Sequence, residues 1–194
     1  MATVRAGGTQ VLMVVDVQVG VMSDAWNAPA VIGRISHAVA RARSAGAPII
    51  WVQHGDDDLP KASPAWQWVP ELGPMNGEHL IHKRFNSSFE QTELDQLLAQ
   101  LGASHIVLAG AATNWCIRAT AYGALERGYD LTLISDAHTT TAIPLENGAT
   151  IDAASIIQEL NIAMNWLTYP GRKNATASAE QVNFCGSSGV RPVS

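Results

Sequence analysis

Short apolar runs alternate along the chain with segments whose apolar residues recur at helical spacing. The runs are rich in β-branched residues, which is typical of strands buried on both faces. The expected strands are residues 11–15, 49–52, 80–83, 105–109 and 131–134, with an edge strand at 181–184. The expected helices carry their apolar stripes over residues 32–42, 94–101, 114–127 and 157–167. Ser88 and Gln91 have the spacing of a capping box before the second of these helices.

Strands that alternate with helices of this length are typical of a parallel sheet with helices on both faces. Because crossovers between parallel strands are right-handed, we predict an α/β protein, a three-layer α/β/α sandwich around a Rossmann-like parallel sheet of about six strands. The 194 residues fit one domain, residues 1–194, with its core at about 9–184 and a flexible tail rich in Gly and Ser at 185–194.

Composition narrows the classes of protein to which this chain can belong. With 47% hydrophobic and 15% charged residues, the chain is unlike a disordered one. Its net charge is −5 and it has no basic block, so we expect neither nucleic acid nor membrane as a partner. The first ten residues lack the apolar core of a signal peptide, and no apolar run reaches the ~18 residues of a membrane span. We therefore expect a cytoplasmic protein.

The chain has two cysteines, Cys116 and Cys185, which are too few for a disulfide scaffold or a Cys-rich zinc site. Cys185 lies in the predicted tail, where we expect it to have no role. Cys116 follows the 105–109 strand across a short turn and stands at the start of a predicted helix. Cys116 is therefore the cysteine with a candidate chemical role.

Three reactive side chains fall at or just beyond predicted strand ends: Asp16, Lys83 and Cys116. Each has a purely structural interpretation, since Asp16 could cap a turn, Lys83 could extend to solvent and Cys116 could be an inert buried thiol. However, the carboxyl ends of parallel strands meet at one edge of a sheet, where α/β proteins place their sites. Together the three residues predict a functional site.

This trio suits acyl transfer to water. A thiolate on Cys116 is favoured by the Lys83 cation and by the positive end of a helix. Asp16 could take the thiol proton and return it to a leaving amine. Backbone N–H groups of the turn 110–116 could stabilise a tetrahedral oxyanion. The chain has neither a G-x-G-x-x-G after the first strand nor a G-x-S-x-G, which disfavours a dinucleotide-binding protein and a serine hydrolase.

Three segments resemble the isochorismatase-like cysteine hydrolase family: VLMVVDVQ, HKRFNSSF and VLAGAATNWCIRATAYGALERGYDLTLISDA. The similarity runs over residues 11–166. Within the family, the metal-free, streptothricin hydrolase-like branch is the most similar, on the segments SDAHTT and NWLTYPGR. The resemblance implies the isochorismatase-like hydrolase fold, with Asp16 as catalytic acid and base, Lys83 as catalytic lysine and Cys116 as nucleophile.

The resemblance also implies a cis peptide bond between Ala111 and Ala112, which aims the N–H of Ala112, with that of Cys116, into an oxyanion hole. Around this site we expect the substrate-binding residues Gln18, Trp26, Phe85 and Trp115.

Nicotinamidases of the family bind a metal through an Asp-x-His pair after the second strand. This chain has QHGDDD over residues 53–58 instead, so the pair is missing. His54, Asp56, His79 and His82 could be imagined as ligands, but scattered His and Asp in a polar loop are usually solvated. We therefore expect no metal and no cofactor.

The segment 55–77 contains Trp66 and Trp68, which could form a lid, a pocket wall or a subunit contact. Asp136 and His138 follow the 131–134 strand, where we expect a turn residue and a helix cap. Since relatives commonly assemble, we expect a homo-oligomer, either a dimer or a tetramer.

The predicted function is a cysteine-dependent amidohydrolase, a hydrolase of carbon–nitrogen bonds other than peptide bonds. It would cleave an amide or lactam of a small molecule through a thioester on Cys116. Two alternatives stay open. One is an isochorismatase-type vinyl-ether hydrolase in which Asp16 is the acid and Cys116 is dispensable. The other is a non-hydrolytic redox or binding protein with a reactive Cys116.

Overall fold

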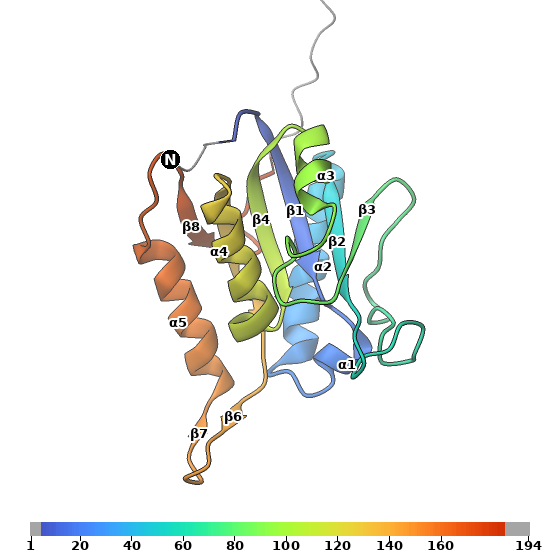
Figure 1. Cartoon of the computed structure of the whole chain (residues 1–194), viewed down its shortest axis with the longest axis vertical. Helices are drawn as coiled ribbons and strands as arrows, with labels where there is room; N and C mark the ends of the chain where they lie inside the picture. Colours follow the sequence, from blue (N-terminus) through green and yellow to red (C-terminus); the bar gives the residue numbers. More distant parts are fainter. Residues whose placement is uncertain (1–4, 185–194) are drawn as a thin grey trace, which may run out of the picture.

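The computed structural model describes residues 5–184, and a six-stranded parallel sheet forms its centre (Figure 1). The strand order is β3–β2–β1–β4–β5–β8. The strands are β1 (Thr9–Val15), β2 (Ile49–His54), β3 (His79–Lys83), β4 (Ala103–Ala111), β5 (Asp130–Thr139) and β8 (Asn174–Ala177). The predicted α/β class and the six-stranded parallel sheet are confirmed.

Helices cover both faces of the sheet, because every central strand is apolar on both sides. In β1, Val11, Met13 and Val15 face one layer, whereas Leu12 and Val14 face the other. The first layer contains α3 (Leu94–Gln100), α4 (Arg118–Glu126) and α5 (Ala153–Trp166), which lie in front of the sheet in Figure 1. Behind the sheet lies α2 (Ala28–Ser44), preceded by the short α1 (Val19–Met22).

The chain runs from β1 to β2 and β3 on one side of the sheet, and returns to β4 on the other side. This reversal between β1 and β4 is the topological switch point, at whose carboxyl edge ligands bind in open α/β sheets. An antiparallel hairpin of β6 (Ile143–Pro144) and β7 (Thr150–Ile151) extends beyond this edge, between β5 and α5 (Figure 1).

The predicted edge strand at 181–184 is wrong. The edge strand is β8, whose polar sequence Asn-Ala-Thr-Ala carries no apolar signal of its own. Its place comes from pairing with β5 and from Asn165 of α5, which binds both the N–H and the hydroxyl of Thr176. Val182 is buried within the α2 layer instead of belonging to the sheet.

The predicted capping box is also wrong. The Ser88 hydroxyl is fully buried and bonds the Thr120 hydroxyl of α4 at 2.9 Å, so it is taken by a tertiary partner. Gln91 has a left-handed backbone with φ of 51°. The helix begins only at Leu94, after Glu93, whose side chain makes no capping bond.

None of the helices described, over residues 5–184, combines the length and the hydrophobicity of a membrane span. Cys185 and the predicted tail at 185–194 lie outside the described residues.

Candidate active site

Asp16 is the residue that follows β1, and its side chain points into a buried position with 1% of its surface exposed. Its backbone is left-handed, with φ of 53°, a conformation that costs a non-glycine residue of order 1–3 kcal/mol. The neighbouring strand approaches closely here, because a Cβ on Gly110 would lie 2.0 Å from the Val15 carbonyl oxygen. The absence of a side chain at Gly110 therefore allows β4 to pack against the backbone of Val15, directly before Asp16.

Lys83 is the last residue of β3, two strands away from β1 in the sheet. Its side chain reaches back to the switch point, where Nζ lies 2.7 Å from Asp16 Oδ2 and 3.1 Å from Cys116 Sγ. The side chains of Lys83 and Asp16 are 0% and 2% exposed. The structure thus brings together Asp16, Lys83 and Cys116, the three side chains predicted at strand ends.

Cys116 stands in a tight turn that joins β4 to α4. The peptide bond between Ala111 and Ala112 is cis. A π-helical turn, Thr113–Ile117, follows it in place of the predicted start of a regular helix at 114. Trp115 and Ile117 both donate their N–H groups to the Ala112 carbonyl at 3.1 Å. This turn places Sγ of Cys116 below the surface, against Lys83.

The electrostatics favour a neutral thiol beside an ion pair. Burial raises the pKa of Cys116, the nearby charge of Asp16 raises it further, and Lys83 opposes this only in part, so the pKa is about 12. Burial by itself would lower the pKa of Lys83, but Asp16 and Cys116 outweigh it and the pKa is raised. The resting site therefore holds a Lys83 ammonium, an Asp16 carboxylate and an uncharged thiol.

The Asp16 carboxylate has capacity left to accept a proton. Among the described residues, its buried Oδ1 has no hydrogen-bond partner, and its buried Oδ2 is held only by the ion pair with Lys83 at 2.7 Å. An unsatisfied buried acceptor is costly unless a proton or a ligand is delivered to it. The site thus contains an acceptor for the proton of an attacking thiol or water.

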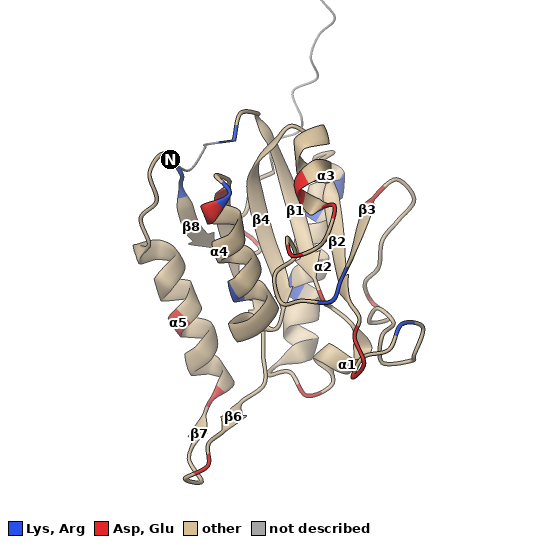
Figure 2. Cartoon of the chain, in the orientation of Figure 1, with Lys and Arg blue, Asp and Glu red and all other residues tan. Residues whose placement is uncertain are grey.

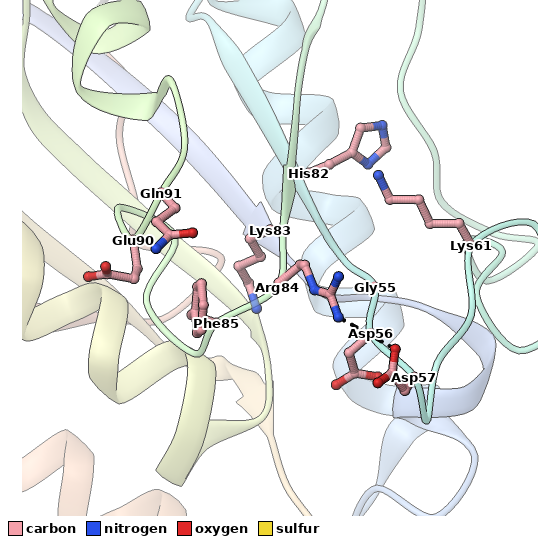
Figure 3. A pocket seen from close by; sticks show the side chains of 10 residues that line it. All are labelled: Gly55, Asp56, Asp57, Lys61, His82, Lys83, Arg84, Phe85, Glu90 and Gln91. Carbon is pink, nitrogen blue, oxygen red and sulfur yellow. Dashed lines mark hydrogen bonds and ion pairs between the residues drawn. The ribbon is translucent and has the colours of Figure 1, made fainter.

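A cavity of about 380 Å³ opens beside Lys83 (Figure 3). Its lining comes from the segment after β2, the end of β3 and the segment before α3: Gly55, Asp56, Asp57, Lys61, His82, Lys83, Arg84, Phe85, Glu90 and Gln91. Both acidic and basic residues lie at this edge of the sheet in Figure 2. Such a lining suits a small polar molecule better than an apolar one.

The four residues predicted to bind substrate lie in different places. Phe85 lines the cavity beside Lys83, as Figure 3 shows. Gln18 is fully buried, and its amide bonds the backbone of His54 and Trp66, so it supports the wall of the site. Trp115 is 56% exposed next to Cys116. Trp26 borders a separate cavity of about 300 Å³ near the end of β5.

The two tryptophans of the segment 55–77 make contacts within this chain. Trp66 stacks on His82 with the ring centroids 5.7 Å apart, and Trp68 meets Trp51 edge to face at 5.4 Å. The two rings hold this segment against β2 and β3.

The residues considered as metal ligands do not converge. His82 stacks on Trp66, whereas the His54 ring lies between Lys83 and Asp56. Within residues 5–184, no three His, Cys, Asp or Glu side chains are grouped so that they could hold an ion.

From the sequence, His54 is a candidate metal ligand only, and its contact with Lys83 is not predicted. The His54 Nδ1 lies 3.2 Å from Lys83 Nζ, and Nε2 lies 2.8 Å from Asp56 Oδ2. The two strand ends are paired, with His54 opposite Lys83. The signal that could have found the contact is the register of β2 and β3, which the sequence does not display.

The expectation that Asp136 and His138 are a turn residue and a helix cap is wrong, because β5 continues to Thr139 and includes both. His138 is buried, and its Nδ1 lies 2.9 Å from the Thr113 hydroxyl of the cysteine turn. Its Nε2 lies 3.1 Å from Asn161 Oδ1 of α5. His138 therefore connects the turn that carries Cys116 to a helix.

We expect His138 to make the protein less stable in acid. Burial lowers its pKa to about 4, against the opposing effects of Asn161 and Asp136. The unfolded chain binds this proton near pH 6.5, so stability is complete above that pH and is lost as the pH falls toward 4. Between pH 7 and pH 5 the loss is about 2 kcal/mol. Urea unfolding of the wild type and His138→Gln at both pH values measures it, and equal losses in the two proteins would contradict this assignment.

The family model for the Isochorismatase domain matches residues 10–159. The chain belongs to the isochorismatase family. The match spans the sheet from β1 to β5 and contains Asp16, Lys83 and Cys116.

Three individual proteins are similar to this chain, two in sequence and one in fold. A streptothricin hydrolase of Streptomyces noursei is 36% identical over 142 residues, which cover 70% of this chain and 51% of the relative. The ureidoacrylate amidohydrolase RutB of Klebsiella pneumoniae is 34% identical over 122 residues, 46% of this chain and 52% of the relative. This chain therefore spans about half the length of these two relatives. The crystal structure of an isochorismatase from Pseudomonas putida KT2440 is 27% identical over 88% of each chain, with a TM-score of 0.78.

Proposed function

We propose that this member of the isochorismatase family is a cysteine-dependent amidohydrolase that cleaves a C–N bond of a small molecule through a thioester on Cys116. The observation that carries the proposal is the buried contact of Lys83 Nζ with both Asp16 Oδ2 and Cys116 Sγ. Lys83 thus holds a carboxylate, which can act as a base, and a thiol against the same ammonium group, and a nucleophile with a neighbouring base is activated.

The first half of the reaction acylates Cys116. As Sγ attacks the amide carbonyl carbon, the thiol proton passes to the Asp16 carboxylate, and the Lys83 ammonium stabilises the charge that develops on sulfur. The carbonyl oxygen becomes an oxyanion, to which we assign the backbone N–H groups of Ala112 and Cys116. The C–N bond then breaks, Asp16 returns the proton to the leaving nitrogen, and an amine departs.

The second half restores the enzyme. Asp16 takes a proton from a water molecule, whose oxygen attacks the thioester carbon. Collapse of this second tetrahedral intermediate breaks the C–S bond, releases a carboxylic acid and returns the proton to Cys116. One amide and one water thus yield one acid and one amine.

The raised pKa of Cys116 favours an attack in which sulfur loses its proton as it bonds to carbon, over attack by a thiolate that is already formed in the free enzyme. It also argues against the redox-sensor alternative, because sensor cysteines react through a low pKa and an accessible thiolate. The names of two relatives, a streptothricin hydrolase and a ureidoacrylate amidohydrolase, support hydrolysis and, for the second, an amide substrate. The polar, charged cavity beside Lys83 supports a small hydrophilic substrate.

The predicted homo-oligomer stays a prediction. Two apolar side chains of α5 are candidates for a subunit contact, because Ile162 is 48% exposed and Trp166 is 82% exposed.

A substrate panel with mass detection tests the proposed function. The protein would be incubated with primary amides, ureido acids, lactams and isochorismate, and its intact mass and the products would be recorded. We expect an acyl adduct on Cys116 with one amide class, together with release of ammonia or an amine. Turnover of isochorismate without an adduct would instead support vinyl-ether hydrolysis, and a panel without turnover or adduct would contradict both.

A further inference from the structure

His54 touches the catalytic machinery but takes no part in the reaction described above. It ends β2 opposite Lys83, so the two side chains leave the sheet next to each other. Its ring is partly buried, with 16% of the side chain exposed. Nδ1 lies 3.2 Å from Lys83 Nζ, on the side toward the catalytic centre.

The contact with Lys83 requires one particular tautomer of His54. A lysine ammonium has three N–H donors and no acceptor. At Lys83 these donors face Asp16 Oδ2, Cys116 Sγ and His54 Nδ1. Nδ1 must therefore carry a lone pair, and the neutral ring must carry its proton on Nε2.

Asp56 is placed to select that tautomer. Its Oδ1 accepts the backbone N–H groups of Asp58 and Leu59 at 3.0 and 2.8 Å, which fixes the carboxylate within its own turn. Its Oδ2 lies 2.8 Å from His54 Nε2. A carboxylate can only accept, so it holds the proton on Nε2, as the buried aspartate of a Ser-His-Asp triad orients its imidazole.

The backbone of His54 is also held. The Gln18 amide accepts the His54 N–H at 2.9 Å and donates to the His54 carbonyl at 3.0 Å. Gln18 donates further to the Trp66 carbonyl, which ties the segment after β2 to the same point. The ring of His54 thus has little freedom to leave Lys83.

We propose that His54 is a positioning residue: oriented by Asp56, its Nδ1 accepts one ammonium N–H of Lys83 and so directs the other two N–H groups at Asp16 and Cys116. Without this acceptor, one buried N–H of Lys83 has no partner, and the ammonium turns toward the cavity. The proposal rests on the proposed function for its kinetic consequence only, because the tautomer and the thiol reactivity can be measured without a substrate.

The first test changes the tautomer while the ring stays in place. In Asp56→Asn the backbone bonds hold Oδ1, so the NH₂ group faces Nε2 and the proton moves to Nδ1. Proton-detected ¹⁵N spectra of histidine-labelled protein should show His54 protonated on Nε2 in the wild type and on Nδ1 in the variant. Asp58→Asn is the matched control, since Asp58 is exposed two residues away and lies outside the cavity lining. A wild-type His54 protonated on Nδ1 would overturn the proposal.

The second test separates the two nitrogens of His54. His54→Asn places a side-chain oxygen near the position of Nδ1, where it can accept from Lys83. His54→Gln places its amide near Nε2, where it reaches Asp56 only. We expect the loss of a hydrogen bond to a charged group to lower kcat about tenfold or more in His54→Gln and in Asp56→Asn. KM should change little in His54→Gln, because His54 lies outside the cavity lining, and His54→Asn should retain most of the activity. Similar losses in His54→Asn and His54→Gln would overturn the proposal.

Alkylation of Cys116 by iodoacetamide provides the readout that needs no substrate. Iodoacetamide reacts with the small fraction of Cys116 that is ionised, and Lys83 stabilises this thiolate. If Lys83 turns away, the alkylation rate at pH 8 should fall in His54→Gln and Asp56→Asn but not in His54→Asn or Asp58→Asn. Circular dichroism and thermal unfolding check that each variant folds. An unchanged rate in all four variants would contradict the positioning role. A panel without turnover, combined with the expected alkylation rates, would contradict only the proposed function.

Discussion

Replacing Cys116 by alanine is expected to lower kcat/KM for an amide substrate roughly 10⁴-fold or more, because removing a covalent nucleophile removes the whole reaction path. The substitution deletes one sulfur from a position that is 9% exposed, so the fold should persist. Steady-state kinetics and intact mass measure the result, and the acyl adduct should disappear together with the activity.

Cys116→Ser is the matched control for this experiment. It keeps the size of the side chain but replaces the thiol with a poorer nucleophile, so it should bind substrate with similar KM and turn it over very slowly. Turnover by Cys116→Ala at the rate of the wild type would contradict covalent catalysis. Such a result would instead favour a reaction in which Asp16 protonates the substrate and Cys116 is dispensable.

Replacing Asp16 by asparagine should damage both activity and stability. It removes the proton acceptor, which predicts a loss of about 10²- to 10⁴-fold in kcat. It also leaves the ammonium of Lys83 buried without its partner at 2.7 Å. Breaking a buried ion pair from one side destabilises a protein by about 3–5 kcal/mol. Kinetics and urea unfolding of the same preparation measure the two effects.

A double variant separates these two effects. Asp16→Asn with Lys83→Met replaces the ion pair with neutral side chains of similar volume, so most of the lost stability should return while the activity stays absent. The ion pair would then be a catalytic arrangement that the fold tolerates. A single Asp16→Asn variant as stable as the wild type would contradict the buried ion pair.

Local pattern was sufficient for the central strands and for most helices. The runs around Val14, Ile50 and Val107 are buried on both faces, and continuous apolar sequence of strand length permits few other structures. Pattern was insufficient at β8, whose four residues have no apolar signal. It was also insufficient at Ser88, whose hydroxyl is bound by Thr120 of α4 instead of capping α3. In both cases a partner distant in sequence decides the conformation.

Some residues of the candidate site could likewise be predicted from local sequence, whereas others could not. Asp16, Lys83 and Cys116 could be named because strand ends follow from the length of each apolar run, and parallel strands end at one edge. His54 could not be assigned its place, because its contact with Lys83 depends on the register between β2 and β3. The hydrogen bonds of the Gln18 amide could not be predicted either, because one of them goes to the Trp66 carbonyl, in a segment far from Gln18 in the sequence.

The sequence by itself determined the α/β class, the parallel sheet and the three residues with chemistry at its edge, because hydrophobic periodicity and strand length are local properties. Only the tertiary structure decided that Cys116 rests as a thiol with a pKa of about 12, that Lys83 has three partners, and that a charged cavity opens beside it. These properties depend on burial and on distances between strands, and both arise only when segments far apart in the chain pack together.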